Sequence, residues 1–442
     1  MGFCKLTISK IRSNNYLKQL KSSALYKIGA ILATFLSMPI MIKYLGVEQF
    51  GIWATMLTLI TWVMLFDLGI GNGLKNTVSE SLAEDNMPQA SGYVSTAYGL
   101  IGILSFGLFT LFLIASIWLP WQSIFNTQSI SESELKNAVI TLSFFIFLNF
   151  WISLVNQIYH GLQKSSIVIL GQFISNSFAL GLVFLLYQFA ESSLIFLVWA
   201  YGIAIVFANL ILTFFLFKSN HQLRPSLQSF DRNKISPLLT LGIKFFIIQL
   251  AVLIIFMTDK ILITQLLGTE NVTPYEVLFK LFSVFTVAHA LILAPLWPAY
   301  SDAYQRGDLD WIRVNIKQQI KIAVILFIGA FILAALGPFI VEIWIGSEVT
   351  ATISIYYLFA VFIVFSVWSN VFAYFVNAVN KLGVQLYTSI IAAVINIPLS
   401  IFLVNSMGLG LEGIVLATII SLSVFAFLGP IQVFRLINEN KK

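Results

Sequence analysis

Long apolar stretches divide the sequence, and each is about as long as a bilayer is thick. A helix needs about 20 mainly apolar residues to cross the hydrocarbon core of a membrane. Only 10% of the residues are charged, whereas a typical soluble domain has about 25%. We therefore expect an all-α integral membrane protein with about twelve transmembrane helices. The expected spans are 24–44, 51–70, 94–119, 137–159, 166–188, 194–217, 238–266, 274–296, 319–341, 351–375, 382–404 and 410–434.

Basic residues gather on one side of these spans. If the N-terminus is cytoplasmic, all but four of the 25 Lys and Arg residues fall in inner segments or the adjoining helix ends. Because cytoplasmic loops are enriched in Lys and Arg, we expect both termini in the cytoplasm. The location of these charges matters more than the net charge of +6, and we expect a lipid bilayer rather than nucleic acid as the partner. The first 21 residues fit either an amphipathic helix on an anionic membrane surface or a solvated basic tail.

A short sequence echo suggests two halves. The stretch from Leu45 to Glu48 (LGVE) follows the first expected span, and the stretch from Leu267 to Glu270 (LGTE) follows the seventh. This agrees with two six-helix bundles around a central cavity, a plan known among transporters. The expected parts are a cytoplasmic basic segment over 1–23, bundles over 24–217 and 238–434, a cytoplasmic linker over 218–237 and a cytoplasmic tail over 435–442.

The segments between the spans are short and carry no catalytic signature. The sequence has no GxxxxGK[ST], HExxH or GxSxG motif, and Cys4 is its one cysteine. Asp308 and Asp310 have the spacing of a metal-binding pair, but no nucleotide-binding domain surrounds them. The three histidines are far apart in the sequence. We therefore expect a protein that is not an enzyme and has no metal site.

Ionisable side chains inside the spans are the candidates for substrate contact. Each costs about 2.5–3.5 kcal/mol at the bilayer centre on insertion scales, so it needs a cavity, a partner or a route to the interface. Lys27, Lys43 and Lys260 could instead extend to lipid headgroups, and Lys280 lies deeper. The candidate cavity cations are Lys280, Lys260, Lys43, Lys27 and Lys244.

Two acids and three other polar residues complete the candidates. Asp67 is either a gate-side acid or the charged end of the second span, and Asp259 lies in the outer half of the seventh. The cavity polar candidates are His289, Gln249 and Asn149. Ordinary packing is the alternative for His289, and interhelical hydrogen bonding is the alternative for Asn149. Lys280 and His289 are nine residues apart, which places them on opposite faces of one helix.

Two regions of the sequence carry distinctive motifs. The first runs from Tyr44 to Trp53 (YLGVEQFGIW) and continues through Asp67 to Leu74 (DLGIGNGL). The second comprises Asp259–Ile263, Tyr275–Lys280 and Pro298–Asp302. Both regions resemble bacterial polysaccharide repeat-unit flippases, the O-antigen and capsule exporters of the multidrug/oligosaccharidyl-lipid/polysaccharide (MOP) superfamily.

The resemblance implies movement of an undecaprenyl-pyrophosphate-linked oligosaccharide from the cytoplasmic to the periplasmic leaflet of the inner membrane by alternating access. It implies coupling to H⁺ or Na⁺ and no other cofactor, with Asp67 or Asp259 as candidate proton carriers. A polysaccharide polymerase and a chain-length regulator are candidate partners in the same membrane. Cations in a low-dielectric cavity attract phosphate, and here they would be lysines because the spans are nearly free of arginine.

Other classes of protein fit less well. A cation-coupled multidrug exporter of the same superfamily would favour an acidic, aromatic cavity, whereas the candidates here lean basic. An O-antigen polymerase or ligase would be expected to have a large periplasmic loop with catalytic arginines, but residues 120–136 are few and include no arginine. A scaffold is the weakest alternative.

Overall fold

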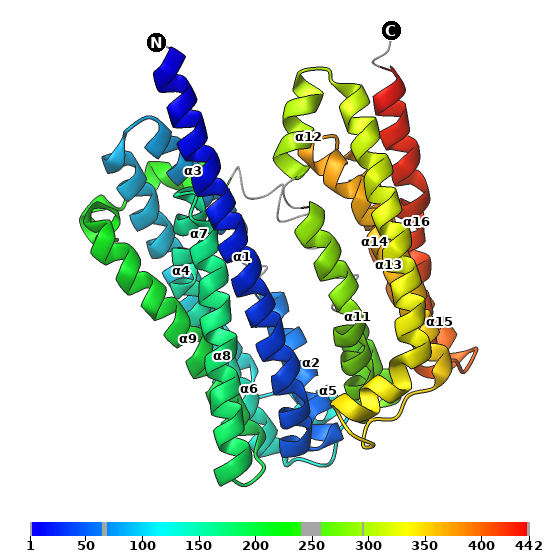
Figure 1. Cartoon of the computed structure of the whole chain (residues 1–442). Helices are drawn as coiled ribbons and strands as arrows, with labels where there is room; N and C mark the ends of the chain where they lie inside the picture. The colour runs from blue at the N-terminus through cyan, green and yellow to red at the C-terminus, as the bar shows by residue number, and fades with distance from the viewer. Residues whose placement is uncertain (1, 64–68, 240–257, 294–295, 440–442) are drawn as a thin grey trace. The chain divides into compact units, whose positions relative to one another are not determined.

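A computed structural model describes residues 2–63, 69–239, 258–293 and 296–439. In these ranges the secondary structure is helical, with no β-strand (Figure 1). Ten described helices are long and apolar enough to cross a membrane, and each overlaps one expected span. The other two expected spans, 51–70 and 238–266, run into residues outside the described ranges. The prediction of an all-α, multi-pass membrane protein is confirmed, and the sidedness of the termini stays a prediction.

The chain forms two compact units, each described by itself. Unit 1 comprises Met1–Gly46, Leu59–Ile124 and Gln128–Ile247, and unit 2 comprises Val47–Thr58, Phe125–Thr127 and Ile248–Lys442. Most of α2 (Val47–Val63) therefore groups with the second half of the chain. The bundles expected from the sequence assign this segment to the first half, and their boundaries stay a prediction.

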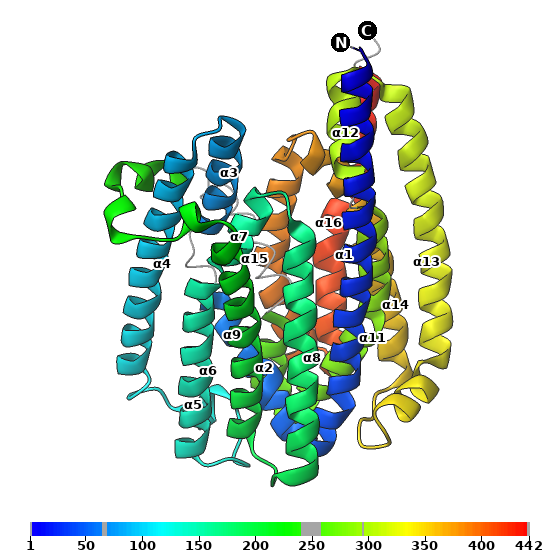
Figure 2. The ribbon, with the colours of Figure 1, turned by 60° about the vertical axis from the view of Figure 1, so that its left-hand side comes forward.

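Side-chain caps begin two of the long helices of unit 1, α4 (Met87–Ala115) and α6 (Glu132–Ile152). The Asn86 side chain accepts a hydrogen bond from the Gln89 N–H at the start of α4, and Ser131 does the same for Glu134 at the start of α6. Such caps satisfy N–H groups that have no partner within the helix. Helix α1 lies beside α8, and α9 packs on both α6 and α8 (Figures 1 and 2). The helices are α1 (Gly2–Leu45), α3 (Ile70–Ala83), α4 (Met87–Ala115), α5 (Trp121–Ile124), α6 (Glu132–Ile152), α7 (Leu154–Gly161), α8 (Ser165–Phe189) and α9 (Leu194–Ser219).

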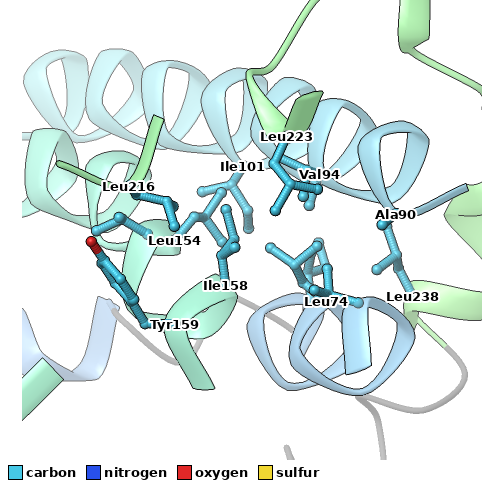
Figure 3. Close-up of a cluster of buried hydrophobic side chains, with 14 of the residues drawn as sticks. Leu74, Ala90, Val94, Ile101, Leu154, Ile158, Tyr159, Leu216, Leu223 and Leu238 are labelled. Carbon is cyan, nitrogen blue, oxygen red and sulfur yellow. The ribbon is translucent and has the colours of Figure 1, made fainter. Parts of the chain in front are cut away.

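Residues 71–93, which separate two of the expected spans, are largely helical. They form most of α3 and the start of α4. Ile70, Leu74 and Val78 recur at every fourth position, lie on one face of α3 and are at most 1% exposed. This face packs against a hydrophobic cluster that includes residues of α4, α6, α7 and α9 (Figure 3). A search for 20-residue apolar runs misses so short an amphipathic helix.

The expected linker 218–237 is an ordered part of unit 1. It contains three short 3₁₀ helices, η2 (His221–Leu223), η3 (Leu227–Ser229) and η4 (Arg232–Lys234). The Ser226 N–H donates to Ser95 Oγ at 3.1 Å, and the Asp231 N–H donates to Thr96 Oγ1 at 3.1 Å. Leu223 belongs to the same hydrophobic cluster (Figure 3). These contacts hold residues 218–237 against the first half of α4.

Unit 2 is built from helices of the second half of the chain. Helix α15 packs on α16, and α14 packs on both α13 and α16 (Figure 1). Residues 297–318, which separate two of the expected spans, are largely helical, because α12 and the first turns of α13 occupy them. Tyr300 of α12 is buried against Phe375 of α14, which explains why this short helix forms. The elements are residues 258–267, η5 (Thr269–Asn271), α11 (Val272–Leu293), α12 (Leu296–Gln305), α13 (Leu309–Trp344), α14 (Ile353–Ala378), α15 (Gly383–Asn405) and α16 (Gly410–Glu439).

The first turns of α2 are bonded tightly within unit 2. Thr273 Oγ1 donates to the Val47 carbonyl at 2.5 Å, and the Thr55 and Thr264 hydroxyls lie 2.8 Å apart. A Cβ added at Gly51 would lie 1.9 Å from the Thr269 carbonyl oxygen, so glycine is needed for this approach. These contacts explain why the start of α2 groups with unit 2.

Candidate functional site

A buried carboxylate lies among three helices of unit 2. Asp259, in the helix over residues 258–267, is 1% exposed. The Tyr275 hydroxyl of α11 donates to Asp259 Oδ2 at 2.7 Å. Thr418 Oγ1 of α16 donates to the same carboxylate, 3.0 Å from Oδ2 and 3.2 Å from Oδ1. Two hydroxyl donors from different helices therefore hold one acid inside the unit.

The network continues onto α15. Asn396 Nδ2 donates to Thr418 Oγ1 at 3.1 Å, so this hydroxyl links the amide to the carboxylate. Asn396 and Ser400 are both fully buried and are four residues apart on one helix face. Among the described residues, Asn396 Oδ1 and Ser400 Oγ have no hydrogen-bond partner. Carboxylate, amide and hydroxyl oxygens of this kind are the ligands that hard cations and buried water prefer.

An ion pair lies directly beside the buried acid. Lys260 Nζ is 2.6 Å from Glu276 Oε2, and the two side chains are 15% and 20% exposed. Consecutive residues of one helix, Asp259 and Lys260, thus contact consecutive residues of the next, Tyr275 and Glu276. The lysine has a carboxylate partner, which is one of the three ways of tolerating a charge within a span. Its assignment as a substrate-binding cation stays a prediction.

The two other polar candidates on α11 differ in burial. Lys280 is partly buried. His289 is fully buried, and neither of its ring nitrogens has a hydrogen-bond partner among the described residues. Both lie on one continuous helix, so the nine-residue spacing does place them on opposite faces.

The candidates of unit 1 lie far apart along their helices. Lys27 Nζ of α1 donates to Gln172 Oε1 of α8 at 3.0 Å, and Lys43 is exposed near the end of α1. Asn149 of α6 is buried and accepts a hydrogen bond from Asn209 Nδ2 at 2.7 Å. Asn209 Oδ1 in turn accepts from Asn156 at 3.0 Å, so these amides link α6, α7 and α9. The structure thus shows Asn149 in an interhelical hydrogen bond, and its place on a cavity stays a prediction.

Three candidates, Asp67, Lys244 and Gln249, lie outside the described residues. Within the described ranges, no three His, Cys, Asp or Glu side chains form a group that could hold a metal ion. Glu276 was missed in the sequence although it lies inside the expected span 274–296. The search for ionisable residues inside the spans, which selected Lys280, would also have found Glu276. Thr418 had no such signal, because a threonine inside a span is ordinary.

Models of two known families match the sequence. The family described as polysaccharide biosynthesis protein matches residues 17–304, and the MatE family matches residues 245–402. A Yersinia pseudotuberculosis protein named "Putative O-antigen export protein" is 26% identical over 80% of this chain and 82% of its own length. A Salmonella typhimurium protein named "Putative O-antigen transporter" is 22% identical over 95% of this chain and 96% of its own length.

Solved structures share the fold. An inward-facing multidrug resistance MATE family transporter of the MOP superfamily matches with a TM-score of 0.80 at 15% identity, over 95% of this chain and 99% of that one. A MOP superfamily transporter from Pyrococcus furiosus matches with a TM-score of 0.65 at 15% identity, over 96% and 97%. Because the first family model covers well over half of the sequence, the chain belongs to the family described as polysaccharide biosynthesis protein.

Proposed function

We propose that this protein is a flippase that moves undecaprenyl-pyrophosphate-linked repeat units of O-antigen or capsular polysaccharide from the cytoplasmic to the periplasmic leaflet of the inner membrane. The observation that carries the proposal is the match to O-antigen export and transport proteins over 80–95% of this chain. The ten candidate spans supply the membrane-embedded body that such transport requires. The step is movement without catalysis, and a polymerase and a chain-length regulator would act on the product.

The Asp259 network is proposed as the place where the coupling ion, H⁺ or Na⁺, binds. A bare charge buried at 1% exposure is costly unless it is neutralised or well bonded. Binding a proton or a cation to this carboxylate would remove that cost. Asn396, which bonds Thr418, has an unpartnered oxygen that is a further candidate ligand, and Ser400 Oγ lies one turn along α15. The network joins the helix of residues 258–267 to α11, α15 and α16, so occupancy by an ion would change how four helices are held together.

Lysine side chains are proposed to bind the pyrophosphate of the substrate. Lys27, Lys43, Lys244 and Lys280 keep this role in the proposal, together with Lys260 when its ion pair with Glu276 opens. Lys280→Ala is expected to lower export while the protein still inserts into the membrane. A variant that exports normally removes Lys280 from the mechanism.

Complementation tests the function. The gene is deleted in a strain that makes a surface polysaccharide, and the leaflet that holds the lipid-linked repeat unit is determined. Accumulation on the cytoplasmic leaflet, reversed by the intact gene, is the expected result. Unpolymerised units on the periplasmic leaflet would contradict flipping and favour a polymerase.

The fold shared with a multidrug transporter favours one second candidate, a cation-coupled drug exporter. Drug susceptibility of the same deletion strain separates the two. Increased susceptibility with unchanged surface polysaccharide would support the exporter and contradict the flippase.

A further inference from the structure

An apolar groove of about 390 Å³ opens between α4 and α6 of unit 1. Five of its eight lining residues are aromatic, and the Phe109 ring centre lies 5.9 and 5.8 Å from those of Phe144 and Phe147. Rings from both helices therefore form its wall. The lining residues are Gly102, Ser105, Phe106, Phe109, Phe144, Phe147, Leu148 and Trp151.

The polar atoms of the lining side chains are already bonded within the protein. The Ser105 hydroxyl donates to the Phe147 carbonyl. Trp151 Nε1 donates to the Tyr98 carbonyl at 3.0 Å. The groove therefore offers a ligand hydrocarbon contacts and no side-chain hydrogen bond, which excludes a sugar or a phosphate as its occupant.

The groove lies on two helices that are long and apolar enough to cross the membrane. Gly102 lies near the middle of α4, and Phe144 to Trp151 lie near the middle of the span Glu132–Gly161. Phe106 at its edge is 76% exposed. An exposed phenylalanine near the middle of a membrane-spanning helix is more stable against lipid hydrocarbon than against water. The apolar lining and the exposed Phe106 therefore favour a groove that opens to the interior of the bilayer.

Gly102 gives the groove its depth. A Cβ at this position would lie 3.1 Å from Trp151 Nε1, so a larger side chain would meet the indole and fill the space. Gly107, on the same helix, has no atom within 4 Å of a corresponding Cβ. The two glycines thus form a matched pair, one inside the groove and one outside it.

We propose that this groove holds part of the polyisoprenoid chain of the lipid-linked substrate, an inference that rests on the proposed function. If a methylene group fills the ~30 Å³ of a liquid water molecule, 390 Å³ holds on the order of a dozen carbons, or two to three isoprene units. An isoprene unit has a double bond, so it has fewer rotatable bonds than a saturated chain and loses less entropy when it is ordered. This favours the isoprenoid over a phospholipid acyl chain.

Photo-crosslinking tests the occupant. The full-length protein carries p-benzoylphenylalanine in place of Phe106 and is placed in vesicles of phosphatidylglycerol and phosphatidylethanolamine with a small fraction of undecaprenyl phosphate. The control carries the same group in place of Leu111, which is 65% exposed and lies nine residues from Gly102, about half a turn around the helix. The groove position should label undecaprenyl phosphate over phosphatidylglycerol by about tenfold more than their mole ratio, equivalent to about 1.4 kcal/mol. Labelling in proportion to mole ratio at both positions means ordinary boundary lipid and overturns the proposal.

Filling the groove provides the second measurement. Gly102→Leu should abolish the selective labelling from position 106 and lower export, whereas Gly107→Leu should change neither. Retained selectivity in Gly102→Leu would also overturn the proposal. If Gly102→Leu does not fold, the proposal is still tested by the lipid labelling of the protein that carries p-benzoylphenylalanine at position 106 and no other change. The labelling experiment tests only whether the groove binds the lipid, because undecaprenyl phosphate carries no sugar. The complementation experiment tests the flippase function separately.

Discussion

The Thr418 hydroxyl connects the amide of Asn396 to the carboxylate of Asp259, and Thr418→Val removes it while nearly keeping the shape of the side chain. Two interhelical hydrogen bonds are lost, at 3.1 and 3.0 Å. Such bonds average about 0.6 kcal/mol and reach about 1.7 kcal/mol in a membrane protein, and the bond to a carboxylate belongs at the upper end. We expect a loss of about 2 kcal/mol in the free energy of unfolding, close to a 30-fold change in the equilibrium constant.

Thr388→Val is the matched control. Thr388 is also buried, at 2% exposure, but its hydroxyl donates only to the Val384 and Gln385 carbonyls of its own helix. Those carbonyls keep their helical bonds, so we expect a change below about 0.5 kcal/mol. Equilibrium unfolding in mixed detergent micelles compares the variants. An equal loss in both would refute the claim that the network joins the helices. The double variant with Tyr275→Phe should depart from additivity by more than about 0.5 kcal/mol, because both hydroxyls bond one carboxylate.

Three further predictions concern packing and charge. Gly51→Ala should destabilise the protein by about 1–3 kcal/mol, because its Cβ would lie 1.9 Å from the Thr269 carbonyl oxygen; an unchanged melting temperature would contradict this. Asn209→Leu should lower the unfolding free energy by about 1–2 kcal/mol in micelles, since Asn209 bonds two other amides. Hydrogen bonds from the Lys234 side chain and the backbone lower the pKa of the Asp231 carboxyl; their contribution is therefore present above the usual Asp pKa of about 3.9 and is lost as the pH falls through the lowered value. Limited proteolysis should show this loosening of the 218–237 segment at acid pH, and Asp231→Asn should remove the pH dependence.

The sequence predicted the long helices well and the short ones poorly. Ten expected spans match described helices because a 20-residue apolar run has few other uses. Helices α3 and α12 were missed because their apolar residues occupy one face only, and that face is covered by tertiary contacts. The 218–237 segment looks like a loop in sequence because its attachment to α4 depends on backbone N–H groups and two hydroxyls.

The candidate site shows a similar division. Asp259 was found because a carboxylate inside an apolar span is rare. Its partners come from residues up to 159 positions away, and their hydroxyl and amide groups are common in spans. The pairing of Lys260 with Glu276 depends on the angle between two neighbouring helices, which residue spacing within one helix does not define.

The attachment of residues 218–237 to α4 also bears on where this chain can be dissected. Leu238 is fully buried in the cluster that contains Leu74 and Ala90 (Figure 3). A chain divided at position 228 would leave Asp231, Lys234 and Leu238 on the C-terminal fragment. The N-terminal fragment would then expose an apolar surface and the Thr96 hydroxyl. A cut within residues 218–238 therefore divides unit 1 itself, although the polar composition of this segment resembles that of a linker between domains.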